Sequence, residues 1–105
     1  MEVVYWGERV KVFIRGVNEE VKIEIGNVID LLIQEGHLIE MPDSKSLGKG
    51  LFELRVQGRL KVRILYIFHN NKAYILHAFI KKTWKIPLND IRYARQVQKE
   101  IIRLA

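Results

Sequence analysis

The segment from Gly50 to Tyr66 most constrains how this chain can fold, because apolar and charged residues alternate along both of its halves. Alternation with a period of two places the two kinds of side chain on opposite faces of a β-strand. Between the halves, the sequence Gln57-Gly58-Arg59 predicts a tight turn, in which Gly58 supplies the positive φ that such turns need. The segment therefore predicts an antiparallel β-hairpin with one apolar face and one charged face.

The charged face of this predicted hairpin has the chemistry of a phosphate-binding site. If the hairpin closes at Gly58, the side chains of Glu53, Arg55 and Arg63 share the solvent-facing side, within reach of one small ligand. An arginine guanidinium stays protonated and can bind a phosphate through two parallel hydrogen bonds. The alternative is that Glu53 only forms a cross-strand salt bridge with one of the two arginines, at the surface of the sheet.

The first part of the chain predicts a short strand followed by two helices. An apolar strand is expected over Val3–Trp6. The segment Glu8–Val17 fits the spacing of a helix and also that of a strand, and a helix is favoured because Glu8 suits a first helical turn. The longest periodic segment, Glu19–Glu35, carries one apolar stripe and predicts a helix, with Gly36 placed to end it.

The second part predicts further strands and one last helix. Turn-forming residues predict a loop over His37–Lys49, before the hairpin. After the hairpin, Asn70-Asn71 predicts a two-residue turn, and Lys72–Lys82 predicts a third long strand. Because Tyr74–Ile80 is apolar on both faces, this strand is expected to be central and covered on both sides. A final helix is expected to begin at residue 88 or 89.

The composition is that of one folded domain, which we expect to span residues 1–105. No run of about 18 apolar residues predicts a membrane span. The N-terminal sequence, with Glu2 and Glu8 but no basic region, predicts no signal peptide, so a cytoplasmic location is expected. With no cysteine and no histidines at helical spacing, the sequence predicts neither a disulfide nor a metal site.

Charge is divided unequally along the chain. Residues 1–43 hold 4 Lys or Arg and 9 Asp or Glu, a net charge of −5, whereas residues 44–105 hold 14 and 3, a net charge of +11. A folded surface with this excess of basic residues favours a polyanionic partner, of which nucleic acid is the commonest. The plainer alternative is a soluble basic protein whose charge serves no partner.

Four short motifs in this order carry a family resemblance. They are SKSLGKGLFELR (Ser44–Arg55), VRILY (Val62–Tyr66), HAFIKKTWKIP (His77–Pro87) and the pair Ala94-Arg95. On these motifs the chain resembles the RelE/HigB superfamily of toxins, and within it the phage-derived branch whose members pair with a helix-turn-helix antitoxin. The resemblance implies an α+β, RelE-like fold, in which two N-terminal helices pack on an antiparallel sheet of about four strands, with a C-terminal helix. It also implies endoribonuclease cleavage of mRNA, usually in the ribosomal A site.

The resemblance further implies roles for residues on the sheet. Arg55, Arg63 and Lys82 match basic residues that surround the scissile phosphate in related toxins, and Glu53 belongs to the Glu-Leu-Arg pattern of this branch. Such cleavage uses the 2′-OH of RNA as its nucleophile. It needs a base, positive charge near the developing phosphorane and an acid for the leaving 5′-oxygen. Glu53 is the only carboxylate within residues 44–87, which makes it the candidate base.

The remaining candidates serve proton transfer or RNA binding. Lys82 or Lys81 is a candidate phosphate clamp or acid, and His77 has the right pKa range for proton transfer. Since His77 lies in an apolar strand, the alternative is a hydrogen-bonded core histidine. The expected RNA-binding residues are Lys61, Lys81, Thr83, Trp84 and Lys85. Trp84 is either a stacking platform for a base or a cover over the last helix, and the lysines are either RNA contacts or solvated charge.

Taken together, the residues and the resemblance predict the toxin of a type II toxin–antitoxin system, acting as a ribosome-dependent mRNA endoribonuclease without a metal or other cofactor. The expected partners are a cognate helix-turn-helix antitoxin, mRNA and the ribosome, and no membrane. One alternative is a non-catalytic RNA-binding or regulatory module on the same fold. Another is an interaction protein whose basic face docks an acidic partner chain.

Overall fold

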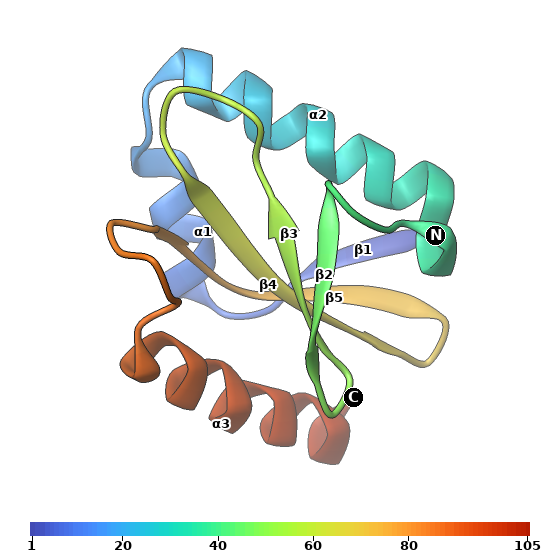
Figure 1. Cartoon of the computed structure of the whole chain (residues 1–105). Helices are drawn as coiled ribbons and strands as arrows, with labels where there is room; N and C mark the ends of the chain where they lie inside the picture. The colour runs from blue at the N-terminus through green and yellow to red at the C-terminus, as the bar shows by residue number, and fades with distance from the viewer.

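The computed structural model describes residues 1–105 and shows a five-stranded sheet packed between three helices (Figure 1). In chain order the elements are β1 Glu2–Tyr5, α1 Glu8–Gly16, α2 Glu19–Glu35, the short 3-10 helix η1 Gly36–Leu38, β2 Ser44–Gly48, β3 Leu51–Arg55, β4 Val62–His69, β5 Lys72–Ile80 and α3 Leu88–Leu104. The strand order across the sheet is β1-β5-β4-β3-β2, with β1 parallel to β5 and the other neighbours antiparallel. The predicted α+β class, with two helices before the main strands and one after them, is confirmed.

Strand β2 is the part of the sheet that the sequence did not predict. The loop predicted over His37–Lys49 is wrong for Ser44–Gly48, which pairs antiparallel with β3 at the edge of the sheet. Most residues of β2 are exposed, and an edge strand with a single partner needs no apolar alternation. The sheet consequently has five strands where about four were expected, and the parallel strand β1 makes it mixed.

The two predicted turns have different outcomes. Asn70 and Asn71 join β4 to β5 with φ values of 51° and 60°, as a two-residue hairpin turn requires. By contrast, residues 56–61 form a longer connection between β3 and β4, so the tight turn predicted at Gln57-Gly58-Arg59 is wrong. Gly58 does not have a positive φ. A Cβ atom there would overlap the carboxylate of Glu24 on α2, which is the flexible end of a side chain and can move aside.

All three predicted helices are confirmed. The ambiguous first segment forms α1, and α2 spans the predicted range Glu19–Glu35. The Asn18 side chain accepts a hydrogen bond from the backbone N–H of Val21 at 2.9 Å and so caps the start of α2, while Gly36 ends it with a φ of 55°. None of the helices combines the length and apolar character that crossing a membrane requires.

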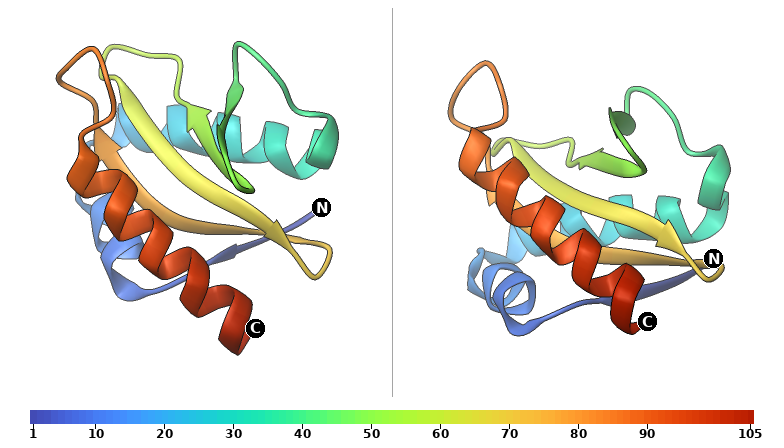
Figure 2. Two further views of the ribbon diagram at one scale, coloured as in Figure 1. Left: turned by 60° about the horizontal axis from the view of Figure 1, so that its bottom comes forward. Right: turned by 90° about the horizontal axis from the view of Figure 1, so that it is seen from below.

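Helices cover both faces of the sheet, which gives the molecule two apolar cores. Helices α1 and α2 lie on one face and α3 lies on the other (Figure 2). Strand β5 contributes Ala73 and Ile75 to the first core, and Tyr74 and Leu76 to the second. This arrangement confirms the prediction of a central strand covered on both sides.

Hydrogen bonds between distant elements fix both ends of the edge strand β2. The hydroxyl groups of Ser44 and Tyr66 lie 2.6 Å apart in the interior and join β2 to β4. At the other end of β2, Arg95 of α3 donates to the carbonyl oxygen of Gly48 at 2.9 Å. The position of β2 therefore depends on contacts with both faces of the fold.

We expect Tyr66→Phe to lower the free energy of unfolding by about 1–2 kcal/mol, because the Ser44 hydroxyl would stay buried without a partner. Ser44→Ala should have a similar cost. The double variant should cost clearly less than the sum of the two, since it leaves neither hydroxyl unpaired. Urea denaturation of the four proteins makes the comparison, and strictly additive losses would show that the two hydroxyls are not coupled.

Candidate functional site

The α3 face of the sheet carries three polar side chains side by side on β3 and β4. The strand register places Arg55 directly opposite Arg63, and Glu53 lies two residues before Arg55 on the same face. Glu53 Oε1 is 3.0 Å from Arg55 Nε, and Glu53 Oε2 is 3.6 Å from Arg63 Nε. Each carboxylate oxygen thus faces one guanidinium. The structure brings together the three residues that the hairpin pattern grouped, and we refer to them as the Glu53 cluster.

The Glu53 cluster is less exposed than the sequence pattern predicts. The Glu53 side chain is 2% exposed, against 12% for Arg63 and 24% for Arg55. The shared face is confirmed, but the prediction that all three face solvent is wrong for Glu53. The carboxylate is buried because β2 continues the sheet beyond β3 and pairs Lys45 in register with Glu53. The cross-strand salt bridge considered as the alternative is also present, in the interior of the protein.

The cluster has one positive charge in excess, because two guanidiniums share one carboxylate. Burial lowers the pKa of the Arg63 guanidinium, an effect that Glu53 opposes and Arg55 reinforces. The Nε–H group of Arg63 is buried and makes no hydrogen bond. Since a buried donor without an acceptor is costly, this N–H group favours a closer approach of Glu53 Oε2, which lies 3.6 Å away. An anion bound beside the two guanidiniums would neutralise the excess charge.

A cleft of about 290 Å³ opens on the Glu53 cluster. Its charged lining consists of one acidic and five basic residues, namely Glu53, Lys45, Arg55, Lys81, Lys85 and Arg95. Arg63 lines an adjoining hollow that it shares with Arg55. Such a surplus of basic groups favours a ligand that carries phosphate. No three His, Asp or Glu side chains gather anywhere in the molecule as a metal-ion site would require.

Two charged residues of this cleft, Lys45 and Arg95, were not among those predicted from the sequence. Lys45 was missed because β2 was interpreted as a loop, although the alternation of serine and lysine over residues 44–46 was a signal for a strand. Arg95 belongs to a motif that carried the resemblance, but no role was assigned to it. In the structure, Arg95 donates to the carbonyl oxygens of Gly48 and Leu47 at 2.9 and 3.1 Å, and so holds the turn between β2 and β3 against α3.

A second basic depression, a hollow of about 550 Å³, adjoins the cleft at the Glu53 cluster. It is lined by Lys61, Lys81, Lys82, Thr83 and Trp84. Four of the five predicted RNA-binding residues therefore lie together, while the fifth, Lys85, lines the cleft at the Glu53 cluster. Trp84 is 96% exposed, so the interpretation of this residue as a cover over the last helix is wrong. Lys81 and Trp84 line both the cleft at the Glu53 cluster and this hollow, and so connect the two basic depressions.

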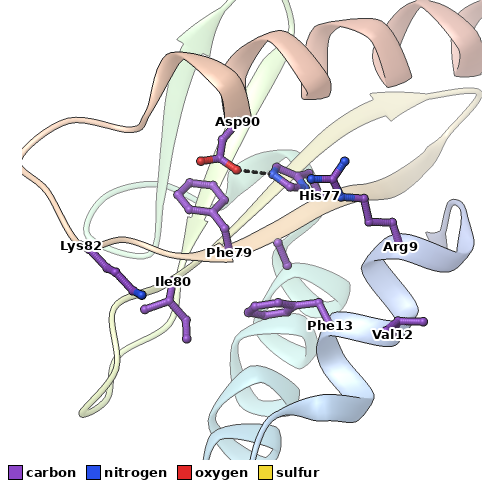
Figure 3. A pocket seen from close by; sticks show the side chains of 9 residues that line it. Arg9, Val12, Phe13, His77, Phe79, Ile80, Lys82 and Asp90 are labelled. Atoms are coloured by element: carbon purple, nitrogen blue, oxygen red, sulfur yellow. Dashed lines mark hydrogen bonds and ion pairs between the residues drawn. The ribbon is translucent and has the colours of Figure 1, made fainter.

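The structure does not bring His77 or Lys82 to the Glu53 cluster. Both line a separate cleft, together with Arg9 and Asp90 (Figure 3). His77 is buried, and its Nε2 atom lies 2.6 Å from Asp90 Oδ1. Burial lowers the pKa of His77, Asp90 opposes this effect, and the Arg9 charge reinforces it. His77 thus has the surroundings of the hydrogen-bonded core histidine that was the alternative to a role in proton transfer.

The stability of the protein should depend on pH through His77. Because the pKa of folded His77 lies below the ordinary value of 6.5, the unfolded state binds this proton more readily. The stability due to neutral His77 is therefore complete above pH 6.5 and is lost as the pH falls through that value. In urea denaturation from about pH 7.5 to about pH 5.5, His77→Gln should lose less stability than the wild type. His37→Gln, which removes an exposed histidine, is the control, and equal losses in all three proteins would contradict the expectation.

Comparison with known proteins identifies the family to which this chain belongs. Over residues 12–99 the sequence matches the model of the family described as phage derived protein Gp49-like (DUF891). The matched range runs from α1 into α3 and contains the Glu53 cluster and both basic depressions. No curated protein matches the chain. Since the match covers most of the chain and agrees with the resemblance carried by the four motifs, the chain belongs to the Gp49-like family of phage-derived proteins, a RelE/HigB-like toxin family.

Proposed function

We propose that this protein is the toxin of a type II toxin–antitoxin system and that it cleaves mRNA at the ribosome as an endoribonuclease. The observation that carries the proposal is the Glu53 cluster, a carboxylate between two guanidiniums in a cleft lined by basic residues. An acid–base group beside an excess of fixed positive charge suits phosphodiester cleavage by the 2′-OH of RNA. Membership of a toxin family gives the proposal its biological context.

In the proposed reaction, the scissile phosphate first takes the place of Glu53 as a partner of the guanidiniums. Arg63, whose side chain is 12% exposed, donates a guanidinium N–H to a phosphate oxygen. The more exposed Arg55 donates to another. Because the phosphate now shares the positive charge, one oxygen of Glu53 is released to accept the proton of the 2′-OH.

The second part of the reaction is an in-line displacement at phosphorus. The 2′-oxygen forms a bond to phosphorus while Arg55 and Arg63 stabilise the added negative charge, each donor contributing about 3 kcal/mol in the transition state. The bond to the 5′-oxygen breaks, and Lys81 or Lys85 of the cleft lining supplies the proton to this leaving group. The products are one RNA that ends in a 2′,3′-cyclic phosphate and one that begins with a 5′-hydroxyl.

The neighbouring basic hollow supports binding of the RNA next to the cut. Lys61 and Lys82 add positive charge for the phosphate backbone. Trp84 presents an aromatic surface on which an unpaired base can stack. We therefore assign Lys82 to backbone binding and give His77 no part in proton transfer at the cut.

The proposed partners follow from the same surface. Residues 44–105 carry a net charge of +11, which suits mRNA and the ribosome. The same charge suits a cognate helix-turn-helix antitoxin that covers the basic cleft with an acidic or amphipathic segment while the pair is intact. The proposal places this activity in the cytoplasm, where translated mRNA is found.

Induced expression of the wild type in a bacterial host should arrest growth and create new mRNA 5′ ends. Arg63→Ala and Glu53→Gln should each reduce cleavage by at least about 100-fold, because each removes a group that acts in the transition state. The measurement is growth together with a map of mRNA 5′ ends.

Arg103→Ala is the matched control, since this exposed arginine lies in the last turn of α3, away from the cleft. It should remain toxic. Circular dichroism of each purified variant separates loss of activity from loss of fold. Arrest that survives both substitutions in the Glu53 cluster would contradict the assignment of the site. Lack of cleavage by the purified wild type on translating ribosomes would contradict the nuclease activity itself.

A non-catalytic RNA-binding module is the second candidate function, and the burial of Glu53 favours it. Both carboxylate oxygens face guanidiniums, and the side chain is 2% exposed, as for a residue that only stabilises the sheet. Such a module would bind RNA at the two basic depressions and leave it intact. Cleavage assays and binding assays on the same RNA separate the two candidates.

For either candidate function, RNA affinity should fall as the salt concentration rises. A plot of the logarithm of the binding constant against the logarithm of the salt concentration should have a slope of about −0.7 for each phosphate neutralised. The double variant Lys81→Ala/Lys82→Ala should reduce the size of this slope by about 1.4. Trp84→Ala should weaken binding by about 1 kcal/mol with little change of slope, because stacking is not ionic. The titrations use a 2′-deoxy RNA, which cannot be cleaved because it lacks the 2′-OH nucleophile. Lys72→Ala, at the far end of β5, is the control. A slope that the double lysine variant leaves unchanged would show that RNA binds elsewhere.

A further inference from the structure

A second cleft, of about 420 Å³, lies between α1, the end of β5 and the start of α3. It contains no residue of the Glu53 cluster. The first turn of α3 separates the two clefts, because Asp90 lines this one and Ile91 lines the other. Its volume is in the range of small-molecule binding sites. It is therefore distinct from the cleft at the Glu53 cluster.

The polar part of this cleft is the pair His77 and Asp90. Their Nε2 and Oδ1 atoms are 2.6 Å apart, and His77 as a residue is only 3% exposed. Because a carboxylate accepts hydrogen bonds, Nε2 carries the proton and the Nδ1 atom of neutral His77 presents a lone pair. Nδ1 and the second carboxylate oxygen of Asp90 make no hydrogen bond within the protein. The cleft thus offers two hydrogen-bond acceptors to a ligand that carries N–H groups.

The apolar part consists of side chains from α1 and β5. Phe13 and Phe79 contribute aromatic rings, and Val12 lies at the rim with 56% of its surface exposed. Figure 3 shows Phe13 and Phe79 beside the space below His77 and Asp90, with Val12 farther out on α1. Aromatic side chains beside hydrogen-bond acceptors suit a flat, nitrogen-rich ring.

Two cations flank the cleft, Arg9 on one side and Lys82 on the other (Figure 3). Both are exposed and neither forms an ion pair with a carboxylate. The Arg9 guanidinium carbon lies 4.1 Å from the centre of the Tyr93 ring, and this cation–π contact stabilises the position of the Arg9 side chain. Unpaired cations at a rim favour an anionic group on the ligand, and phosphate is the anion that arginine binds best with two hydrogen bonds.

We propose that this cleft binds a nucleotide, with its base against Phe13 and Phe79 and hydrogen-bonded to the His77–Asp90 pair, and with its phosphate at Arg9. A nucleotide combines a flat ring, N–H donors and a phosphate in one molecule. An acidic peptide segment lacks a ring with donors for the two inner acceptors. The proposal does not depend on RNA cleavage, since it uses no residue of the Glu53 cluster.

Two ligands with the same chemistry could supply this nucleotide. It is either a free nucleotide or one nucleotide of an RNA that also reaches the Glu53 cluster. Glu53 and His77 both pair in register with Leu65, so they lie on one row of the sheet, two strand spacings or about 10 Å apart. A single RNA strand is long enough to span that separation.

Titration of the full-length protein with 5′-AMP, followed by NMR of backbone amides, tests the site. We expect saturable shifts of resonances from the start of α1 and the end of β5. Adenosine and inorganic phosphate should each bind more weakly than 5′-AMP, because each offers only half of the contacts. Arg9→Ala should weaken 5′-AMP binding about tenfold through loss of a charged hydrogen bond. Arg15→Ala, on the same helix but paired with Glu8, is the matched control and should leave the affinity unchanged.

Val12→Trp gives an independent test, because a large ring at this exposed rim position should fill the cleft without disturbing the fold. It should abolish the 5′-AMP shifts. A wild-type spectrum without saturable shifts would overturn the proposal, and so would equal loss of affinity in Arg9→Ala and Arg15→Ala. An acidic peptide that produces these shifts where 5′-AMP does not would also overturn it.

A competition experiment identifies the source of the nucleotide. A short 2′-deoxy RNA that displaces 5′-AMP from the wild type assigns the site to bound RNA. Retention of 5′-AMP beside the bound RNA assigns it to a free nucleotide. Both results support the cleft as a nucleotide site, and they are independent of whether Glu53→Gln abolishes cleavage.

Discussion

Strands β4 and β5 are covered by apolar side chains on both faces, and the arrangement of the polar groups follows from this constraint. A strand pair buried on both sides can carry polar side chains only where the covering helices stop or where the charges are paired. On the α3 face, the Glu53 cluster lies on one side of the start of the helix, and the His77–Asp90 pair lies on the other. Both groups are therefore held by a rigid core rather than by loops alone.

Charge balance distinguishes the Glu53 cluster from an ordinary buried ion pair. One guanidinium would be enough to compensate one carboxylate, yet Glu53 has Arg55 at 3.0 Å and Arg63 at 3.6 Å. The second guanidinium adds a buried charge that fold stability does not require. Three lysines and another arginine line the same cleft, which adds to the excess. An arrangement that is electrostatically incomplete by itself and complete with a phosphate is typical of a binding site.

Local signals made much of the fold predictable, and long-range contacts account for what was missed. The helix α2 could be predicted from its apolar stripe and from Asn18 and Gly36 at its two ends. The strand β2 has no such pattern, because it is held at the sheet edge by contacts to residues 22 and 47 positions away in the sequence.

The same distinction applies to the candidate site. The grouping of Glu53 with Arg55 and Arg63 follows from alternation within neighbouring strands, which is a local property. The burial of Glu53 depends on β2 and could not be predicted once β2 was interpreted as a loop. The separation of His77 from Glu53 follows from the strand order, because both residues pair in register with Leu65 on the strand between them. The contact of His77 with Asp90, by contrast, depends on where α3 begins in space, and no local pattern encodes that placement.

The chain contains two tryptophans, and their surroundings are opposite. Trp6 packs edge-on against Tyr74, with ring centroids 6.0 Å apart, and its indole N–H donates to Glu100. Trp84 is 96% exposed and stands at the basic hollow. The emission of an indole shifts to longer wavelength in water and is quenched when another ring stacks on it. The protein consequently carries an intrinsic fluorescent reporter at its basic surface, and a second tryptophan, fixed in the fold, that serves as an internal reference.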